Sequence, residues 1–336
     1  MKRNQIGMAL VLALGLSAGM ARAEGELASP NYQLTKRIAV GGPAQWDYIT
    51  VDADAHRLYL AQGVRIAVVD TAEGKLLGEV TGLSGAHGVA LVPEMKKGFA
   101  TSGKDKSVVV FDLETFKVLK TIPTGADKPD AIVYDPASKR VFVCNGKVGP
   151  VTVIDPAALD AATTSIDVAG KLEFAAADGA GHVYVNVEDK SELVAINSKT
   201  MKVDGHWPLA PGEEPTGLAM DATARRLFVG CGNKKMVVVD ADSGKIVATP
   251  TIGEGVDGVA CDGKLGLALS ANGKDATATV VNAKGEVVQT VTTVKGARTI
   301  ALDEKTHAVY LPAMIEQDGK KTFGVVVLEP KIANAK

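Results

Sequence analysis

The segment PTGLAMDATARRLFVGCGNKKMVVVDADSGKIVATPTIGEG, residues 215–255, decides the fold, because the rest of the chain can be aligned with it. It contains four short runs of apolar and β-branched residues, and turn-forming sequences such as DATA, GCGN and DSG separate them. Each run is too short for a helix and is therefore predicted to be a strand. Four strands in about forty residues predict one small antiparallel sheet. The runs lie at residues 218–220, 227–229, 236–239 and 246–251.

The same pattern recurs along the chain at intervals of 40 to 43 residues. We call the residue that opens each unit its entry residue, and an Asp follows five positions later in every unit except the second, where Val92 stands. In six units the third strand ends in Asp or Asn, whose short side chains can bond the backbone of their own turn. The seven entry residues are Asp47, His87, Asp130, Glu173, Thr216, Asp257 and Arg298.

Seven such units predict an all-β fold, a seven-bladed β-propeller with four antiparallel strands per blade. The seventh unit, which starts at Ala297, lacks a fourth strand of its own. Residues 32–42, YQLTKRIAVGG, align with the fourth strand of the second unit, so the N-terminal strand is predicted to close the last blade and to remove an open sheet edge. We therefore expect a single propeller domain over residues 32–330, followed by a C-terminal tail at residues 331–336.

The N-terminus has the pattern of a secretory signal peptide. Basic residues precede an apolar run at residues 6–20, and Ala-Arg-Ala at residues 21–23 is a small-residue cleavage site. The run is shorter than the roughly 20 residues that span a membrane, so no membrane span is expected after cleavage. Residues 1–23 are thus predicted to be removed, residues 24–31 to form a flexible leader, and the protein to be periplasmic or secreted.

The charge of the chain does not indicate a basic nucleic-acid-binding protein, because the formal net charge is −2. Lysines nevertheless gather in the loops that join the second and third strands, which lie on the same face of a propeller as the entry residues. They either hold an anionic polymer around the channel mouth or are solvated turn residues. Nucleic-acid binding therefore stays open but unsupported. The lysines are Lys104, Lys106, Lys147, Lys190, Lys234, Lys235, Lys274, Lys320 and Lys321.

The sequence carries no motif of a known catalytic centre. It has no GxSxG, phosphate-loop or HExxH pattern, and no Cys/His spacing typical of haem or zinc binding. We therefore expect no catalytic residues and no cofactor. The odd number of cysteines, Cys144, Cys231 and Cys261, leaves open either a bridge between the last two or three thiols that pack as small apolar side chains.

The entry residues are the best candidates for a functional site, because a propeller aims the start of every innermost strand at the channel axis from one face. Four of the seven are acidic, and units one to four supply Asp, His, Asp and Glu in succession. These side chains are suitable ligands for a divalent cation such as Ca²⁺. Arg298 can pair with Asp257 or with Asp47 on either side of it. A satisfied polar channel, recognition of a ligand or partner, and a metal site all remain open.

Three aromatic residues lie next to entry residues. Trp46 offers a flat surface at the channel mouth, whereas Tyr48 and Phe174 are expected to pack between blades. The predicted ligand-binding set is Trp46, Asp47, His87, Asp130, Glu173, Thr216, Asp257 and Arg298.

The repeats also carry a family resemblance. Residues 225–255, 139–156 and 105–125 resemble the YVTN β-propeller repeat, which has a Leu-Tyr-Val strand, a Val-rich strand ending in Asp and a Lys-Val-Val strand ending in Gly. With the signal peptide, the chain is similar to the exported bacterial YncE-like proteins. The resemblance implies the fold more than the function, since relatives include surface-layer proteins, haem d1 domains and lactonase-type propellers.

The sequence thus predicts an exported, non-enzymatic binding or scaffold protein. We expect a monomer that recognises a protein or a small-molecule ligand at the face of the entry residues. The alternative is a metal-dependent hydrolase of lactonase type, with His87 as proton carrier. Its candidate ligands are Asp47, Asp130, Glu173 and Asp257.

Overall fold

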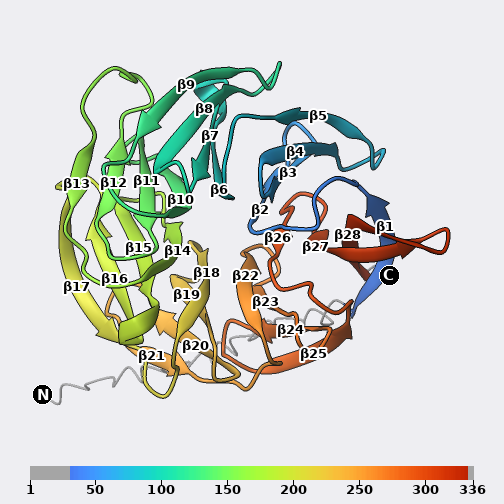
Figure 1. The fold of residues 1–336 in the computed structure, drawn as a ribbon. Coiled ribbons are helices and arrows are strands. Elements are labelled where there is room, and N and C mark those ends of the chain that lie inside the picture. Colours follow the sequence, from blue (N-terminus) through green and yellow to red (C-terminus); the bar gives the residue numbers. More distant parts are fainter. Residues whose placement is uncertain (1–30, 332–336) are drawn as a thin grey trace, which may run out of the picture.

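The computed structural model describes residues 31–331, and this part of the chain forms seven four-stranded antiparallel sheets. Figure 1 shows the sheets arranged as blades around a common centre, with the first strand of each blade innermost. The prediction of an all-β, seven-bladed propeller is confirmed. The predicted signal peptide, nearly all of the predicted leader and residues 332–336 lie outside the described residues.

The first four blades follow the chain in order, each from its inner to its outer strand. Their strands are β2 (Ile49–Asp52), β3 (Arg57–Gln62), β4 (Arg65–Asp70) and β5 (Leu76–Val80); β6 (Ala86–Val92), β7 (Lys97–Ser102), β8 (Ser107–Asp112) and β9 (Val118–Pro123); β10 (Pro129–Asp135), β11 (Arg140–Asn145), β12 (Val151–Ile154) and β13 (Thr164–Ile166); and β14 (Leu172–Ala177), β15 (His182–Val187), β16 (Glu192–Asn197) and β17 (Lys202–Pro208).

Blades five and six repeat this order, whereas blade seven takes its outermost strand from the N-terminus. The strands are β18 (Pro215–Asp221), β19 (Arg226–Cys231), β20 (Lys235–Asp240) and β21 (Ile246–Ala248); β22 (Val256–Asp262), β23 (Leu267–Asn272), β24 (Thr277–Asn282) and β25 (Val287–Thr292); and β26 (Ala301–Leu302), β27 (Val309–Gln317), β28 (Lys320–Lys331) and β1 (Asn31–Ala39).

Strand β1 closes the ring, as the sequence predicted. It pairs with β28 from Asn31 opposite Lys331 to Ala39 opposite Gly324. Gln289 of blade six holds the backbone of Tyr32 from the other side, accepting from its N–H at 2.9 Å and donating to its carbonyl at 2.8 Å. The first and last strands of the domain therefore lie side by side, as the blue and red arrows of Figure 1 show.

The predicted role of the Asp and Asn residues that end the third strands is confirmed, for example at Asp112, which accepts hydrogen bonds from two backbone N–H groups of its own turn. The Asp found five positions after an entry residue acts in the same way, a role that was not predicted. Asp52, at the end of β2, accepts hydrogen bonds from the backbone N–H groups of Asp54 and Ala55. Asp221 does the same for Thr223 and Ala224. These residues close the turns between first and second strands, on the face opposite the entry residues. We call the other face, where the innermost strands begin, the entry face.

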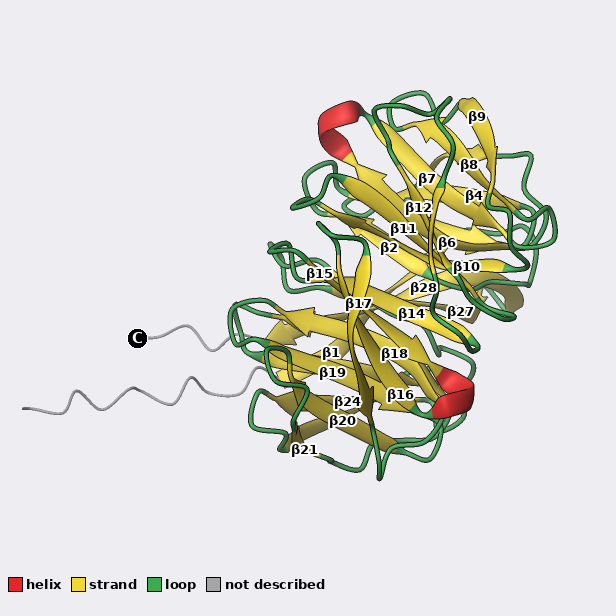
Figure 2. Ribbon diagram, turned by 90° about the vertical axis from the view of Figure 1, so that its left-hand side faces the viewer, coloured by secondary structure: helices red, strands yellow, loops and turns green. Residues whose placement is uncertain are grey.

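Loops and two short 3₁₀ turns cover both faces of the ring. The turn η1 (Pro93–Met95) joins β6 to β7, and η2 (Glu188–Lys190) joins β15 to β16. Figure 2 shows them (red) on opposite faces of the ring. Within residues 31–331, no helix has the length and apolar character needed to cross a membrane.

The hydrophobic core lies between neighbouring blades. Tyr59 of blade one and Phe111 of blade two share one cluster, with ring centroids 6.0 Å apart. Tyr32 of β1, only 1% exposed, packs among residues of blades six and seven such as Leu269 and Val326. Each blade thus depends on both neighbours, and the closing strand is part of the core.

Tyr32 tests the contribution of the closing strand. Replacing Tyr32 with Ala removes a fully buried aromatic ring and should lower the free energy of unfolding by about 3–5 kcal/mol. Thr35→Ala, at an exposed position of the same strand, should change it by less than about 0.5 kcal/mol. Urea unfolding monitored by circular dichroism measures both variants, and equal effects would show that packing of β1 is not what holds the blade.

Candidate functional site

A one-residue bulge lies at the entry position of most innermost strands. In blade two the pairing of β6 with β7 shifts register between Ala86 and Val89, on either side of His87. A bulge takes a side chain out of the regular alternation of the strand and bends the backbone locally. The same shift surrounds four other entry residues, which are Asp130, Glu173, Thr216 and Asp257.

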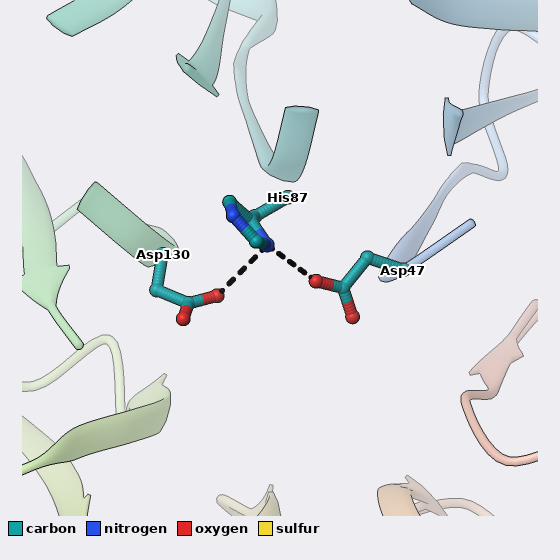
Figure 3. A group of neighbouring side chains, drawn as sticks. All are labelled: Asp47, His87 and Asp130. Carbon is teal, nitrogen blue, oxygen red and sulfur yellow. Dashed lines mark hydrogen bonds and ion pairs between the residues drawn. The ribbon is translucent and has the colours of Figure 1, made fainter. Parts of the chain in front are cut away.

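Three entry residues from consecutive blades meet directly. The Nδ1 atom of His87 lies 2.5 Å from Oδ2 of Asp47 and 3.4 Å from Oδ1 of Asp130. Figure 3 shows the imidazole between the two carboxylates. His87 and Asp47 are each partly exposed, whereas Asp130 is only 2% exposed. Residues that are 40 and 43 positions apart in the chain therefore form one cluster.

Opposite charges in this cluster stabilise one another's ionised forms. Burial opposes protonation of His87, but the hydrogen bond to Asp47 and the charge of Asp130 outweigh it and raise the pKa of His87. Lys128 places Nζ 2.8 Å from Oδ2 of Asp130. Burial raises the pKa of Asp130, while the charges of His87 and Lys128 oppose this rise. The cluster is thus a hydrogen-bonded arrangement of two carboxylates, an imidazole and an ammonium group.

The distances between the ligand atoms of Asp47, His87 and Asp130 fit a proton shared in a hydrogen bond better than a metal ion bound by all three residues. One ligand atom from each of Asp47, His87 and Asp130 lies within 4.8 Å of the others, so the residue types and their proximity match the predicted cation site. However, neighbouring ligands of a cation with bonds of about 2.1 Å are separated by about 3 Å, and the closest pair here is at 2.5 Å. The second oxygen of Asp130 is already bound to an ammonium group.

The fourth entry residue, Glu173, is buried beside the cluster. It accepts a hydrogen bond from the hydroxyl of Tyr48 at 3.4 Å, and Lys171 Nζ lies 3.3 Å from its other oxygen. Burial, followed by the charge of Asp130, raises the pKa of Glu173 to about 8. Lys128 and Lys171 both stand two positions before an acidic entry residue. Sequence reasoning missed them, although this spacing was visible in it.

Tyr48 packs between blades, as expected, but it does so across the channel, between blades three and four and not beside its own blade one. Its ring lies edge-on to Phe174, with centroids 4.8 Å apart, although the two residues belong to blades one and four. Tyr48 packs among core residues of blades three and four, including Leu172. The position after the entry residue is small in the other blades, for example Gly88 and Gly217, and this contrast was the missed signal.

Tyr48 and Phe174 line a cavity of about 540 Å³ that extends along the inner strands toward the opposite face, to Asp52 and Pro93. Apolar side chains such as Val133 form most of its wall. The two aromatic rings form the end of this cavity nearest the entry residues. The channel is therefore filled by side chains at the level just below the entry residues.

On the other side of the ring, Arg298 joins two predicted site residues. Its Nε donates to Oδ2 of Asp257 at 2.8 Å, and its Nη2 donates to the carbonyl oxygen of Trp46 at 2.8 Å. The guanidinium also lies over the indole ring, 5.5 Å from its centroid. Of the two pairings left open by the sequence, the structure has the one with Asp257.

Thr216 belongs neither to the cluster around His87 nor to the pair of Arg298 with Asp257. Its hydroxyl donates to the carbonyl of Val256 at 3.1 Å, which joins blade five to blade six. The structure thus places the entry residues in two polar groups, with Thr216 in a backbone contact between them.

A pocket of about 740 Å³ opens between these groups on the entry face. Four of the predicted residues line it, namely Trp46, Asp47, His87 and Arg298, whereas Asp130 and Glu173 lie deeper. Gly103 and Lys104 of blade two and Lys128 of blade three add to the wall. A Cβ atom on Gly103 would lie 2.7 Å from Nε2 of His87, so glycine leaves room beside the imidazole.

Four of the nine loop lysines pair with carboxylates that join neighbouring loops. Asp127 binds Lys106 at 2.5 Å and Lys147 at 3.4 Å. Glu254 binds Lys234 and Lys274 in the same way. These pairs join neighbouring loops and favour the interpretation of solvated turn lysines over a continuous basic rim. All three cysteines are free thiols, so the open alternative of a disulfide is not realised.

The comparisons with known proteins support the fold. The Kuenenia stuttgartiensis hydrazine synthase structure has a TM-score of 0.72 and 14% sequence identity, over 88% of this chain and 98% of that chain. The structure of U3-55K has a TM-score of 0.73 and 9% identity, over 87% and 97%. No protein-family model and no curated protein matches the sequence. At these identities the likeness establishes the β-propeller and leaves the function open.

The raised pKa of Glu173 predicts a loss of stability with rising pH. The folded protein keeps a proton on Glu173 that the unfolded chain releases above about pH 4.5, so each step in pH from there to about 8 lowers the free energy of unfolding. Glu173→Gln should be neutral at pH 5 and stabilising at pH 8, by an amount on the order of a few kcal/mol.

Thermal unfolding at pH 5, 6, 7 and 8 measures this difference. The matched control is Glu213→Gln, which removes an exposed carboxyl from the entry face and should follow the parent at every pH. Parallel curves for Glu173→Gln and the parent would mean that Glu173 is ionised in the folded protein at neutral pH.

Proposed function

We propose that this protein is an exported, non-enzymatic binding or scaffold protein that recognises a ligand or partner at its entry face. The β-propeller fold suits binding in general, because rigid blades hold side chains from distant parts of the chain in fixed positions. Preorganised groups lose little conformational entropy when a ligand binds.

The observation that carries this proposal is the entry-face pocket. It combines the side chains of Trp46, Asp47, His87 and Arg298 in one hollow of about 740 Å³, a volume typical of ligand sites. Its polar groups are held in place by partners within the protein, since His87 is bound by Asp47 and Arg298 by Asp257. Below the pocket, the side chains of Tyr48 and Phe174 lie across the channel. This arrangement suits a closed pocket better than an open pore.

The proposed export rests on the sequence. The basic start, the apolar run at residues 6–20 and the cleavage site at residues 21–23 support a mature chain that begins at Glu24. The YVTN-type repeat at residues 225–255 supports a place among exported YncE-like propellers. We place the protein in the periplasm or outside the cell on these grounds.

The pocket can be tested with a substitution that adds a methyl group beside His87 without changing charge. Chain purified from the exported fraction under native conditions should carry a bound small molecule or partner, detected by native mass spectrometry. Gly103→Ala places a methyl group against the His87 ring and should remove most of the bound species. Its melting temperature in the absence of ligand should stay within about 3 °C of the parent.

Val148→Ala is the matched control. Val148 is 67% exposed in a loop of the same face, and it does not line the pocket. This variant should retain the bound species at the level of the parent. Equal retention by Gly103→Ala and Val148→Ala would place the binding surface elsewhere, and a parent chain that never carries a bound species would contradict the proposed binding role.

A metal-dependent hydrolase is the second candidate, favoured by the proximity of Asp47, His87 and Asp130. This function requires the cluster to open and to bind a divalent cation in place of the shared proton. Millimolar Ca²⁺ or Zn²⁺ should then raise the melting temperature of chelator-treated protein, since a ligand that binds only the folded state stabilises it. An unchanged melting temperature with both metals would exclude this candidate.

A further inference from the structure

The charge of the entry-face pocket differs from the acidic ring that the sequence suggests. One carboxylate lines the pocket, that of Asp47, against four basic side chains, which are those of His87, Lys104, Lys128 and Arg298. Asp130 and Glu173 do not line it. The groups that a ligand meets first in this pocket are therefore mostly hydrogen-bond donors.

The acidic entry residues already have partners within the protein. Asp47 is bound by His87, Asp257 by Arg298, and Asp130 by Lys128. Glu173 has Lys171 as its partner at 3.3 Å, and burial, followed by the charge of Asp130, raises the pKa of this carboxyl. A cationic ligand would have to replace these partners, whereas an anionic ligand would not.

The basic residues, in contrast, keep donors that the protein does not use. Among residues 31–331, Nζ of Lys104 has no hydrogen bond or ion pair, and neither has Nη1 of Arg298. His87 bonds Asp47 through Nδ1, and Nε2, on the other side of the ring, lies beside Gly103. When the ring is protonated, which the raised pKa of His87 favours, Nε2 is a further donor.

The wall of the pocket also has an apolar part. The Trp46 ring lies under the Arg298 guanidinium, and Val64, which is 58% exposed, stands at the rim. A flat ring and an aliphatic side chain beside several donors suit a molecule with an anionic group and a carbon skeleton. Inorganic ions alone would leave this part of the wall uncovered.

We propose that the entry-face pocket binds a small organic anion, whose carboxylate or phosphate group lies among His87, Lys104 and Arg298 and whose carbon skeleton lies against Trp46. Charge-assisted hydrogen bonds from guanidinium, ammonium and imidazolium groups to such an anion are stronger than neutral ones. This proposal rests on the binding role proposed above and names the chemistry of the ligand.

Trp46 supplies a readout inside the pocket. The chain has two tryptophans, and the second, Trp207, lies in the outer strand of blade four. In the Trp207→Phe background, citrate and inorganic phosphate are titrated separately at constant ionic strength while Trp46 emission is recorded. A saturable change is expected with at least one of them. A response to phosphate alone identifies a phosphate ligand, and a response to citrate alone or to both identifies a carboxylate-accepting site.

Two matched charge reversals complete the experiment. Lys104→Glu should weaken binding of the active anion by about tenfold or more, because it replaces a donor with a carboxylate. Lys320→Glu makes the same charge change at an exposed position of the same face that does not line the pocket, and it should leave binding within about twofold, because salt screens charges at that distance.

The proposal is overturned if neither anion changes Trp46 emission, or if both reversals weaken binding equally. The experiments distinguish an error in the proposed anion chemistry from an error in the proposed binding role. If Gly103→Ala removes the native ligand but neither citrate nor phosphate changes Trp46 emission, the pocket binds a ligand that is not an anion.

Discussion

The pairing of β1 with β28 is the constraint on which the rest of the structure depends. Neighbouring blades share their hydrophobic clusters, so no blade can bury its faces without both neighbours. When the N-terminal strand completes blade seven, the ring closes and the distances between the innermost strands become fixed. This closure is what brings Arg298 of blade seven and Trp46 of blade one, 252 residues apart in the chain, to within 2.8 Å.

Closure also explains why the channel is not empty. The inner strands approach closely enough that a Cβ atom on Gly217 would lie 2.8 Å from the backbone of blade six. Small residues after the entry position permit this approach in most blades, and the two large exceptions, Tyr48 and Phe174, meet each other across the axis. The polar pocket above them and the apolar cavity below them thus have different chemistry.

The electrostatics of the entry face follow from the cost of burying charge. A carboxylate in the narrow part of the ring loses much of its hydration, and it must be neutralised by a partner or keep its proton. Asp130 is neutralised by Lys128. For Glu173, the raised pKa favours the protonated carboxyl. The acidic residues are therefore satisfied from within, while Lys104 and Arg298 keep donors for an external ligand.

Local pattern in the sequence was enough to predict the seven blades, the closing strand and the role of turn residues such as Asp112 and Asp240. Each of these depends on strand alternation, turn chemistry and the repeat length, which are properties of neighbouring residues. The alignment of the repeats also indicated which residues stand at the channel mouth. Which of them touch was decided only by the tertiary structure. The contact of His87 with both Asp47 and Asp130, the bond of Thr216 to the backbone, and the reach of Tyr48 into blade four depend on the radius of the closed ring and on bulges in its inner strands, and no single repeat contains that information.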